Sequence, residues 1–276
     1  RYFHKQSSLA KTILAAGGLQ PVDLVALCEV ENDSVMHFLC RRTRLARLGY
    51  EYLVTHSADR RGIDVALLYQ PETFALLHSE TYRVPYDSLR ERPTRDLLHA
   101  AGRLPFGDTL DVFVVHFPSR RGGATISEPY RLRAAGILRH LADSIAHCRH
   151  TPRLLAMGDF NDEPHNASVS RVLAPTFAEL TSHATPLPAE GHDDIEGSYY
   201  FRGEWSRIDQ ILVSPTLLSP TMKFHTTPQS VHLLAFPPLL ETLGRGTLSK
   251  PFRTYLGPFY HGGISDHLPL CIDFSY

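Results

Sequence analysis

The chain has 276 residues, of which 43% are hydrophobic and 21% are charged. These fractions are ordinary for a soluble globular protein, and the length gives enough material for an ample core. The formal net charge is -1. Proteins that neutralise nucleic-acid phosphates usually carry a basic excess. The neutral balance therefore argues against tight duplex binding, although a local basic patch is compatible with it.

The cysteines and the apolar runs exclude several other classes. No Cys-x-x-Cys pair occurs among Cys28, Cys40, Cys148 and Cys271, so we expect neither a zinc site nor a disulfide scaffold. No apolar run approaches ~18 residues, so we expect no membrane span. The chain begins at Arg1 without an apolar signal core, so we expect a mature or trimmed form, either cytoplasmic or exported after signal removal.

Hydrophobic periodicity predicts helices that alternate with many strands. Helices are predicted over 5–16, 33–48 and 127–147. Strands are predicted over 22–29, 51–56, 63–69, 74–84, 94–101, 109–117, 153–157, 208–213 and 268–274. The stretches 184–197 and 214–262 are rich in Pro, Gly, His and Thr, and we expect long loops there. This order predicts an α+β fold, a two-sheet sandwich flanked by helices within one domain over 1–276.

The strongest chemical signal is an apolar strand that runs directly into Gly158-Asp159-Phe160-Asn161-Asp162. A strand end exposes its last side chains at the sheet rim, where Asp159 could activate water or bind a cation. Asn161 could donate a hydrogen bond to an anionic oxygen. An Asx-rich turn followed by a capped helix explains this motif equally well when it is taken alone.

Two other predicted strands end in similar chemistry. The strand over 22–29 ends in Glu29, with Glu31 on the same strand face, so only one of the two need bind a metal. Mg²⁺ prefers one or two carboxylates plus water and phosphate oxygens. His116 follows four apolar residues, and Arg120 lies just beyond it, where a guanidinium could match phosphate geometry. The alternatives are a polar strand terminus and a core histidine followed by a solvated basic turn.

Two late segments complete the pattern. Asp209 lies in an apolar strand, and Asp266-His267 precedes the final strand. A buried carboxylate can fix the tautomer of a histidine and raise its basicity. Hydrolysis of a phosphoester needs such a base, a metal that offsets charge, and donors to the nonbridging oxygens. The sequence contains no Gly-x-Ser-x-Gly elbow and no phosphate loop of the Gly-x-x-x-x-Gly-Lys type.

The order of these motifs resembles that of the endonuclease/exonuclease/phosphatase superfamily. The matching features are Glu29, His116 in Val-Val-His-Phe-Pro, Gly-Asp-Phe-Asn at 158–161, Arg-Ile-Asp at 207–209 and Ser-Asp-His at 265–267. The resemblance implies a four-layer α/β/β/α sandwich of two mainly antiparallel sheets. It also implies hydrolysis of a phosphoester substrate with Mg²⁺ as the cofactor, or with Mn²⁺ or Ca²⁺.

The resemblance also implies roles for individual residues. Glu29 is expected to be the main metal ligand, with Asp266 on the metal side. His267 is expected to act as the base or to hold the scissile phosphate, with Asp209 orienting it. Three more catalytic residues are expected. Asp159 would bind or deprotonate the attacking water, and Asn161 would hold a phosphate oxygen. His116 would contact the phosphate or assist the leaving group. The expected phosphate contacts are Arg61, Arg95, Ser119 and Arg120.

One departure from the family concerns the N-terminus. The family opens with a strand that ends in Asn, whereas this chain opens with a helix and shows no strand before Val22. We therefore expect a missing N-terminal strand, a longer natural protein, and weak activity of the chain as given.

The substrate class is left open among several candidates. We favour a phosphodiesterase or nuclease-like hydrolase acting as a monomer, with nucleic acid as a candidate partner. The alternatives are a phosphomonoesterase, a sphingomyelinase-like lipid phosphodiesterase, and a catalytically degenerate binding module of the same fold.

Overall fold

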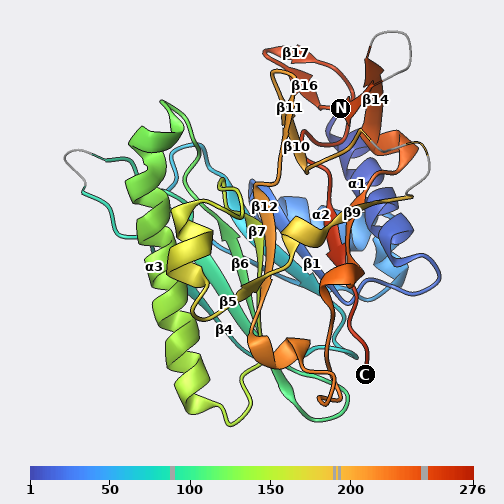
Figure 1. The fold of residues 1–276 in the computed structure, drawn as a ribbon. Coiled ribbons are helices and arrows are strands. Elements are labelled where there is room, and N and C mark those ends of the chain that lie inside the picture. Colours follow the sequence, from blue (N-terminus) through green and yellow to red (C-terminus); the bar gives the residue numbers. More distant parts are fainter. Residues whose placement is uncertain (88–90, 189–190, 192–193, 244–247) are drawn as a thin grey trace.

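The computed structural model describes residues 1–87, 91–188, 191, 194–243 and 248–276. Its elements form four layers (Figure 1): helix α3 covers one face of a six-stranded sheet, whose other face packs on a second layer of strands, and helices α1 and α2 cover that layer. The expected α/β/β/α sandwich is therefore confirmed. The helices are α1 (Tyr2–Gly17), α2 (Asp33–Arg42) and α3 (Ala124–Cys148).

The six-stranded sheet has the order β4-β5-β6-β7-β12-β8. Its strands are β4 (Ala75–Tyr82), β5 (Leu97–Arg103), β6 (Thr109–His116), β7 (Leu154–Asp159), β8 (Ala178–Glu179) and β12 (Asp209–Val213). All neighbours pair antiparallel except β6 and β7, which are parallel and are connected through α3. Because parallel neighbours need such a crossover, β6 and β7 both end at the same edge of the sheet.

The second strand layer is divided. One part has the order β1-β3-β2, and the other has the order β18-β13-β9. These strands are β1 (Leu24–Val30), β2 (Glu51–Val54), β3 (Asp64–Tyr69), β9 (Thr185–Leu187), β13 (Val231–Leu234) and β18 (Leu270–Ile272). Within the described residues, β1 and β18 are each the outer strand of their sheet, and neither pairs with the other.

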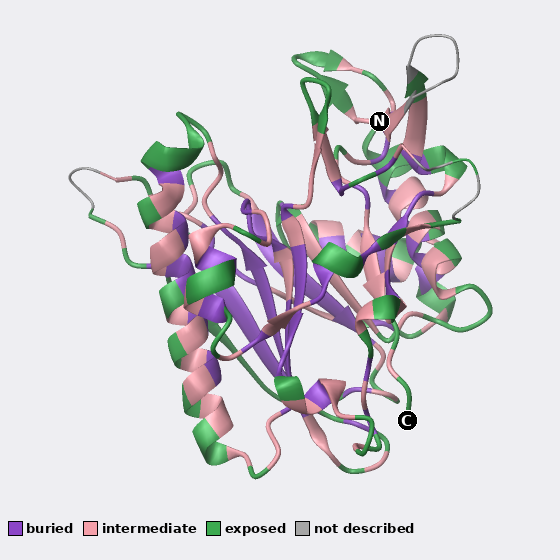
Figure 2. Ribbon diagram, viewed as in Figure 1, coloured by how far each residue is buried: buried purple, intermediate pink, exposed green. Residues whose placement is uncertain are grey.

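Alternation along the strands accounts for the layers. Val112 and Val114 of β6 belong to the core between the sheets, whereas Phe113 and Val115 belong to the core under α3. All four are fully buried. Figure 2 shows the same burial along the central strands. Strands buried on both faces read as continuous apolar runs, which explains why the sequence located them well.

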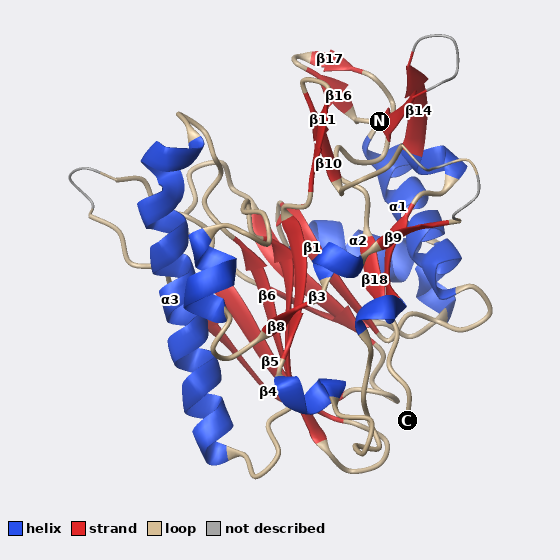
Figure 3. Cartoon of the chain, in the orientation of Figure 1, coloured by secondary structure: helices blue, strands red, loops and turns tan. Residues whose placement is uncertain are grey.

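Two expectations about local structure were wrong (Figure 3). The helix predicted over 33–48 ends at Arg42, because the Thr43 hydroxyl accepts the Leu45 amide (3.2 Å) and starts a separate 3₁₀ turn, Arg44–Arg47. The expected loops contain β9, β13 and two hairpins: β14 (Leu240–Leu243) with β15 (Leu248–Pro251), and β16 (Tyr255–Leu256) with β17 (Phe259–Tyr260). These short strands lie in stretches rich in Pro, Gly, His and Thr, so no periodic pattern marks them. A third hairpin, β10 (Tyr199–Phe201) with β11 (Glu204–Ser206), lies between the two stretches. Residues 189–190, 192–193 and 244–247 of those loops lie outside the described residues.

Candidate active site

Three neighbouring strands bring His116, Asp159 and Asp209 into one row. His116 ends β6 and lies opposite Asp159 in the parallel register, and Asp159 lies opposite Asp209 in the antiparallel register. Gly158 makes this close approach possible, because it has a φ of 138° and a Cβ there would lie 2.0 Å from the Val115 carbonyl oxygen. Only glycine adopts that backbone conformation without strain.

His267 joins this row from the segment before β18. Its Nδ1 lies 2.7 Å from Asp209 Oδ2, and the Ser198 hydroxyl donates to the same oxygen at 2.5 Å. Burial alone would lower the pKa of His267. The charge and hydrogen bond of Asp209, together with the charges of Asp159 and Asp266, outweigh burial and raise the pKa to about 10. The imidazole is therefore held as a cation whose Nε2 is the ring nitrogen left for a ligand.

Asp159 lies in a different environment. Its Oδ1 accepts the Asn161 backbone amide at 2.8 Å, its Oδ2 accepts Asn161 Nδ2 at 3.1 Å, and His116 Nε2 lies 3.4 Å away. Burial and the neighbouring charge of Asp209 raise the pKa of Asp159 to about 7, against the opposing charge of His267. A carboxylate with such a pKa can exchange a proton near neutral pH.

His116 has the opposite shift from His267. Burial, followed by the positive charges of Arg95, Arg61 and His267, keeps the pKa of His116 well below its usual value. His116 is therefore neutral at physiological pH. The site thus combines the neutral imidazole of His116, the carboxyl group of Asp159 with a pKa of about 7, and the imidazolium of His267.

Glu29 lies at the rim of the same site. A bulge between Cys28 and Val30 turns it out of the β1 ladder, and its φ is 59°. Asn161 has a φ of 50°. Left-handed backbone at a residue other than glycine costs about 1–3 kcal/mol and is concentrated at functional sites. The Glu29 carboxylate is exposed and lies 3.6 Å from Arg61 Nη1.

The metal-ligating groups do not form a ready-made cage. Across the part of the chain that the structure describes, no three His, Cys, Asp or Glu side chains converge as a metal-binding cluster. Glu29 and Asp266 nevertheless line one groove with Asp159 and His267. One or two exposed carboxylates are the donor set that Mg²⁺ uses when water and phosphate complete its shell. The residues present therefore fit a divalent cation that is bound partly by its substrate.

Six of the eleven predicted site residues line this groove, namely Glu29, His116, Asp159, Asp209, Asp266 and His267. The other five do not line it. Asn161 lies behind Asp159 and donates Nδ2 to the Phe117 carbonyl at 3.0 Å. Ser119 is half-buried in the segment after β6.

The three predicted phosphate-binding arginines contact protein groups. Arg95 is 4% exposed, and its guanidinium contacts Asp59 Oδ2 at 3.2 Å and the Phe117 carbonyl. Arg61 pairs with Glu29 and with Asp59, where Nε to Oδ1 is 3.4 Å. Arg120 donates to the Asn161 carbonyl at 2.7 Å. All three support the loops around the groove, and their phosphate contacts stay a prediction.

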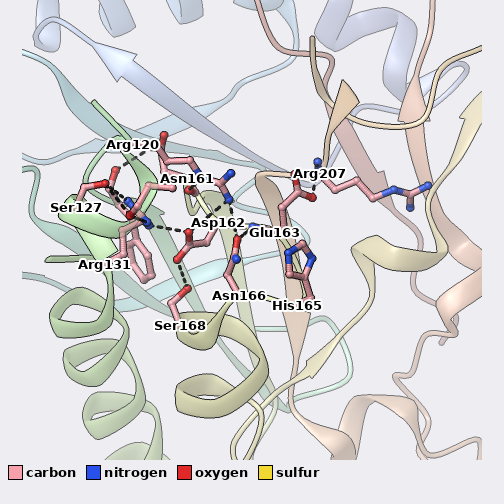
Figure 4. A network of polar contacts seen from close by, with 12 residues as sticks. Arg120, Ser127, Arg131, Asn161, Asp162, Glu163, His165, Asn166, Ser168 and Arg207 are labelled. Atoms are coloured by element: carbon pink, nitrogen blue, oxygen red, sulfur yellow. Dashed lines mark hydrogen bonds and ion pairs between the residues drawn. The ribbon is translucent and has the colours of Figure 1, made fainter. Parts of the chain in front are cut away.

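A buried ion pair anchors the loop after β7 (Figure 4). Arg131 Nε of α3 lies 2.7 Å from Asp162 Oδ1, and both side chains are 2% exposed. The Ser168 hydroxyl donates to Asp162 Oδ2 at 2.7 Å. Arg120 adds a longer contact of 3.5 Å to Asp162 Oδ1. Asp162 therefore ties the Asp159–Asn161 turn to helix α3.

Sequence reasoning missed three residues of the site. Ser198 donates to Asp209, Tyr199 packs its ring 4.7 Å from the His267 ring, and Asp59 lies between two arginines. Ser198 and Tyr199 fall in a segment that carried no periodic signal. The glycine directly before them, Gly197, is the signal that could have marked this segment. A Cβ on Gly197 would lie 2.4 Å from the Ser206 carbonyl oxygen, so this glycine permits a close chain crossing.

The fold is thus a four-layer sandwich that carries a row of histidine and carboxylate side chains at one edge of its six-stranded sheet. A sequence model described as the Endonuclease/Exonuclease/phosphatase family matches residues 1–275. The chain therefore belongs to this family, whose members include nucleases and phosphatases and typically use divalent metals.

Solved structures agree with the fold. An endonuclease/exonuclease/phosphatase from Bacteroides vulgatus is similar at a TM-score of 0.68 and 15% identity, covering 100% of this chain and 91% of that chain. TDP2 from D. rerio in complex with a single-strand DNA product is similar at a TM-score of 0.64 and 16% identity. The match covers 100% of this chain and 93% of that chain. A mannosyl-6-phosphatase from Bacteroides thetaiotaomicron is similar at a TM-score of 0.63 and 14% identity. The match covers 100% of this chain and 92% of that chain. No curated protein matches the sequence significantly. None of the described helices is long and apolar enough to cross a membrane.

Proposed function

We propose that this chain is a divalent-metal-dependent phosphodiesterase that hydrolyses its substrate by attack of water on phosphorus. The observation that carries the proposal is the row in which Asp209 Oδ2 lies 2.7 Å from His267 Nδ1 and opposite the buried Asp159. A donor to the phosphoryl oxygen and a base for the water are two of the groups that the reaction needs, beside a metal that offsets charge.

The electrostatics divide the work between these residues. Asp159 accepts the proton of the attacking water, because its pKa of about 7 suits a general base. His267 donates Nε2 to a nonbridging oxygen and stabilises the charge that develops there, with Asp209 fixing its orientation. The neutral His116 contacts the phosphate or the leaving group. Of the two roles expected for His267, we therefore propose that it binds the phosphate and that Asp159 acts as the base.

A divalent cation held by Glu29 and Asp266 would offset phosphate charge when bound. In the structure Arg61 pairs with Glu29, so metal binding requires that this loose contact be released or shared. The similarity to TDP2 with its bound single-strand DNA supports a nucleic-acid diester as the substrate. The similarity to a mannosyl-6-phosphatase supports a phosphomonoester as the second candidate.

The test compares two small substrates with and without metal. Hydrolysis of bis-p-nitrophenyl phosphate and of p-nitrophenyl phosphate is followed in Mg²⁺, Mn²⁺, Ca²⁺ or EDTA, with single-stranded DNA and phospholipid as natural diesters. Diester hydrolysis that requires metal, and that His267→Ala abolishes, supports the proposal. The matched control is His140→Ala, an exposed histidine on α3. Turnover of the monoester alone supports the phosphatase, and binding without turnover in any metal supports a degenerate binding module.

A further inference from the structure

A hollow apart from the active site lies between the outer strands of two sheets. Over the residues that the structure describes, β2 is the outer strand of the sheet β1-β3-β2, and β4 is the outer strand of the six-stranded sheet. The hollow has a volume of about 470 Å³, and we call it the β2–β4 hollow; it is lined by Val54, His56, Thr81, Arg83 and Asp96. None of these five residues lines the active-site groove. The volume lies within the range of small-molecule sites.

Asp96 forms the floor of this hollow. Its side chain is 4% exposed, and its Oδ1 has no hydrogen-bond partner among the described residues. The two residues before it share this feature, because Thr94 Oγ1 and Arg95 Nε are also buried without a partner. Folded proteins leave few buried polar atoms unsatisfied, so an external hydrogen-bond donor is the partner expected for Asp96.

The neighbouring Asp64 shows how a buried carboxylate is normally satisfied. Asp64 is 6% exposed, and its Oδ1 accepts the Thr55 hydroxyl at 2.9 Å and the Ser57 backbone amide at 2.8 Å. Burial raises the pKa of Asp96, the charge of Arg83 lowers it, and the charge of Asp64 raises it further. Two buried carboxylates thus give this corner an excess of negative charge. A cation that carries N–H donors is therefore the group that would stabilise Asp96 best.

The rest of the hollow indicates a larger ligand than a bare ion. A water-sized ion occupies only about 30 Å³, and no three His, Cys, Asp or Glu side chains converge as a metal site in the described part of the chain. Arg83 is exposed at the rim and forms no ion pair within the described residues. The other basic group, His56 Nε2, already lies 3.1 Å from Asp33 Oδ2. A ligand that reaches Asp96 therefore meets a free guanidinium at the rim, and a guanidinium matches a carboxylate or phosphate group.

We propose that the β2–β4 hollow binds a small zwitterion of the amino-acid class, with its ammonium group on the Asp96 carboxylate and its acidic group on the Arg83 guanidinium. The ammonium group supplies the donor that Asp96 Oδ1 lacks, and the acidic group neutralises Arg83. A ligand with only one of the two charges leaves the other side chain unpaired, so zwitterions are preferred. The site is separate from phosphoester hydrolysis, because it shares no lining residue with the active-site groove.

The first experiment measures binding to the chain of 276 residues by amide NMR in EDTA. Glycine, β-alanine and 4-aminobutyrate, which differ in the distance between their two charges, are titrated while the amide shifts of Thr81, Arg83 and Asp96 are followed. At least one of them is expected to give saturable shifts with a Kd of about 10 mM or lower. Butyrate and butylamine are the single-charge controls and are expected to bind at least about tenfold more weakly. The absence of saturable shifts with all three amino acids, or equal binding of either control, overturns the proposal.

Two substitutions test whether the named side chains hold the ligand. Asp96→Asn and Arg83→Gln are each expected to weaken binding of the tightest amino acid by at least about tenfold. Arg103→Gln is the matched control, since Arg103 is exposed at the other end of β5 from Asp96 and lies outside the hollow. Unchanged affinity in Asp96→Asn or in Arg83→Gln, or an equal loss in Arg103→Gln, overturns the proposal.

The unfolding temperature separates a binding role of Asp96 from a structural one. Asn in place of Asp96 removes a buried charge that has no partner, so Asp96→Asn is expected to raise the unfolding temperature by about 2–4 °C without ligand. A fall in that temperature overturns the proposal, because the protein itself would then pair the carboxylate. The bound amino acid is expected to raise the unfolding temperature of the unmutated chain but not that of Asp96→Asn. None of these readouts depends on phosphoester hydrolysis, so the proposed function can fail while this site stands.

Discussion

Replacement of Asp209 by Asn is the sharpest perturbation of the proposed site. The amide has the shape of the carboxylate but carries no charge, and it cannot hold the imidazolium of His267. Raising the pKa of His267 from 6.5 to about 10 corresponds to about 5 kcal/mol in favour of the charged ring. Asp209 is the leading favourable cause, because it contributes both a charge and the 2.7 Å hydrogen bond.

The expected magnitude follows from that free energy. If Asn removes about half of it, the His267 pKa falls to about 8. Above that pH the ring is neutral, and kcat/KM for a phosphodiester is expected to fall by about tenfold per pH unit relative to the unmutated chain. Asp159 also loses a neighbouring negative charge, so its pKa of about 7 is expected to fall, which moves the acid limb of the rate profile to lower pH.

Two assays check these outcomes separately. Hydrolysis of bis-p-nitrophenyl phosphate over a pH series gives kcat/KM, and proton NMR titration of the imidazole ring gives the pKa of His267. Asp23→Asn is the matched control, since Asp23 is exposed and lies before β1. The reasoning is refuted if the His267 pKa stays near 10 in Asp209→Asn. It is also refuted if that pKa falls while kcat/KM is unchanged.

Three further perturbations test the metal, the loop anchor and the acid stability. Glu29→Gln is expected to raise the Mg²⁺ concentration for half-maximal activity by about tenfold or more, whereas Glu31→Gln leaves it unchanged; equal effects would count against Glu29 as the ligand. Arg131→Met removes the nearest cation from the buried Asp162 and leaves it only the Ser168 hydroxyl and the longer contact to Arg120. The change is expected to cost about 3 kcal/mol in chemical denaturation, and a loss under 1 kcal/mol would contradict the anchoring role. Burial would raise the pKa of Asp111, but hydrogen bonds from a histidine and an arginine hold that pKa below 3.8. The stability that its charge contributes is therefore present above pH ~4 and is lost as the pH falls through the folded pKa. Asp111→Asn should therefore flatten the acid limb of stability, and an unchanged limb would exclude that account.

The sequence located the strands and their chemical ends because those signals are local. β3, β6 and β7 are apolar runs buried on both faces, and a polar residue at the end of such a run stands out. The alignment of His116 with Asp159 and Asp209 depends on register between strands far apart in the chain, which no local pattern encodes. That alignment became visible only in the folded sheet.

The arginines show the opposite limit. Arg95 and Arg120 have the residue type expected of phosphate contacts, yet they donate to backbone carbonyls, to a carboxylate and to the Asn166 side-chain amide oxygen. A guanidinium has five donors and suits both tasks equally well. Only the packing of the loops decides between them, so sequence alone could not separate a phosphate-binding arginine from one that supports the site.

The two halves of the proposed site differ in how firmly they are held. His116, Asp159 and Asp209 lie on adjacent paired strands of the six-stranded sheet, so their mutual positions are fixed by continuous ladders. Glu29 instead lies in the bulge near the end of β1, and His267 precedes β18. These two strands are the outer strands of two separate sheets. Over the described residues, no shared β-ladder sets the distance between the Glu29 carboxylate and the imidazolium. Because a misplacement of about 1 Å can cost about 100-fold in rate, catalytic efficiency depends on how firmly that distance is held.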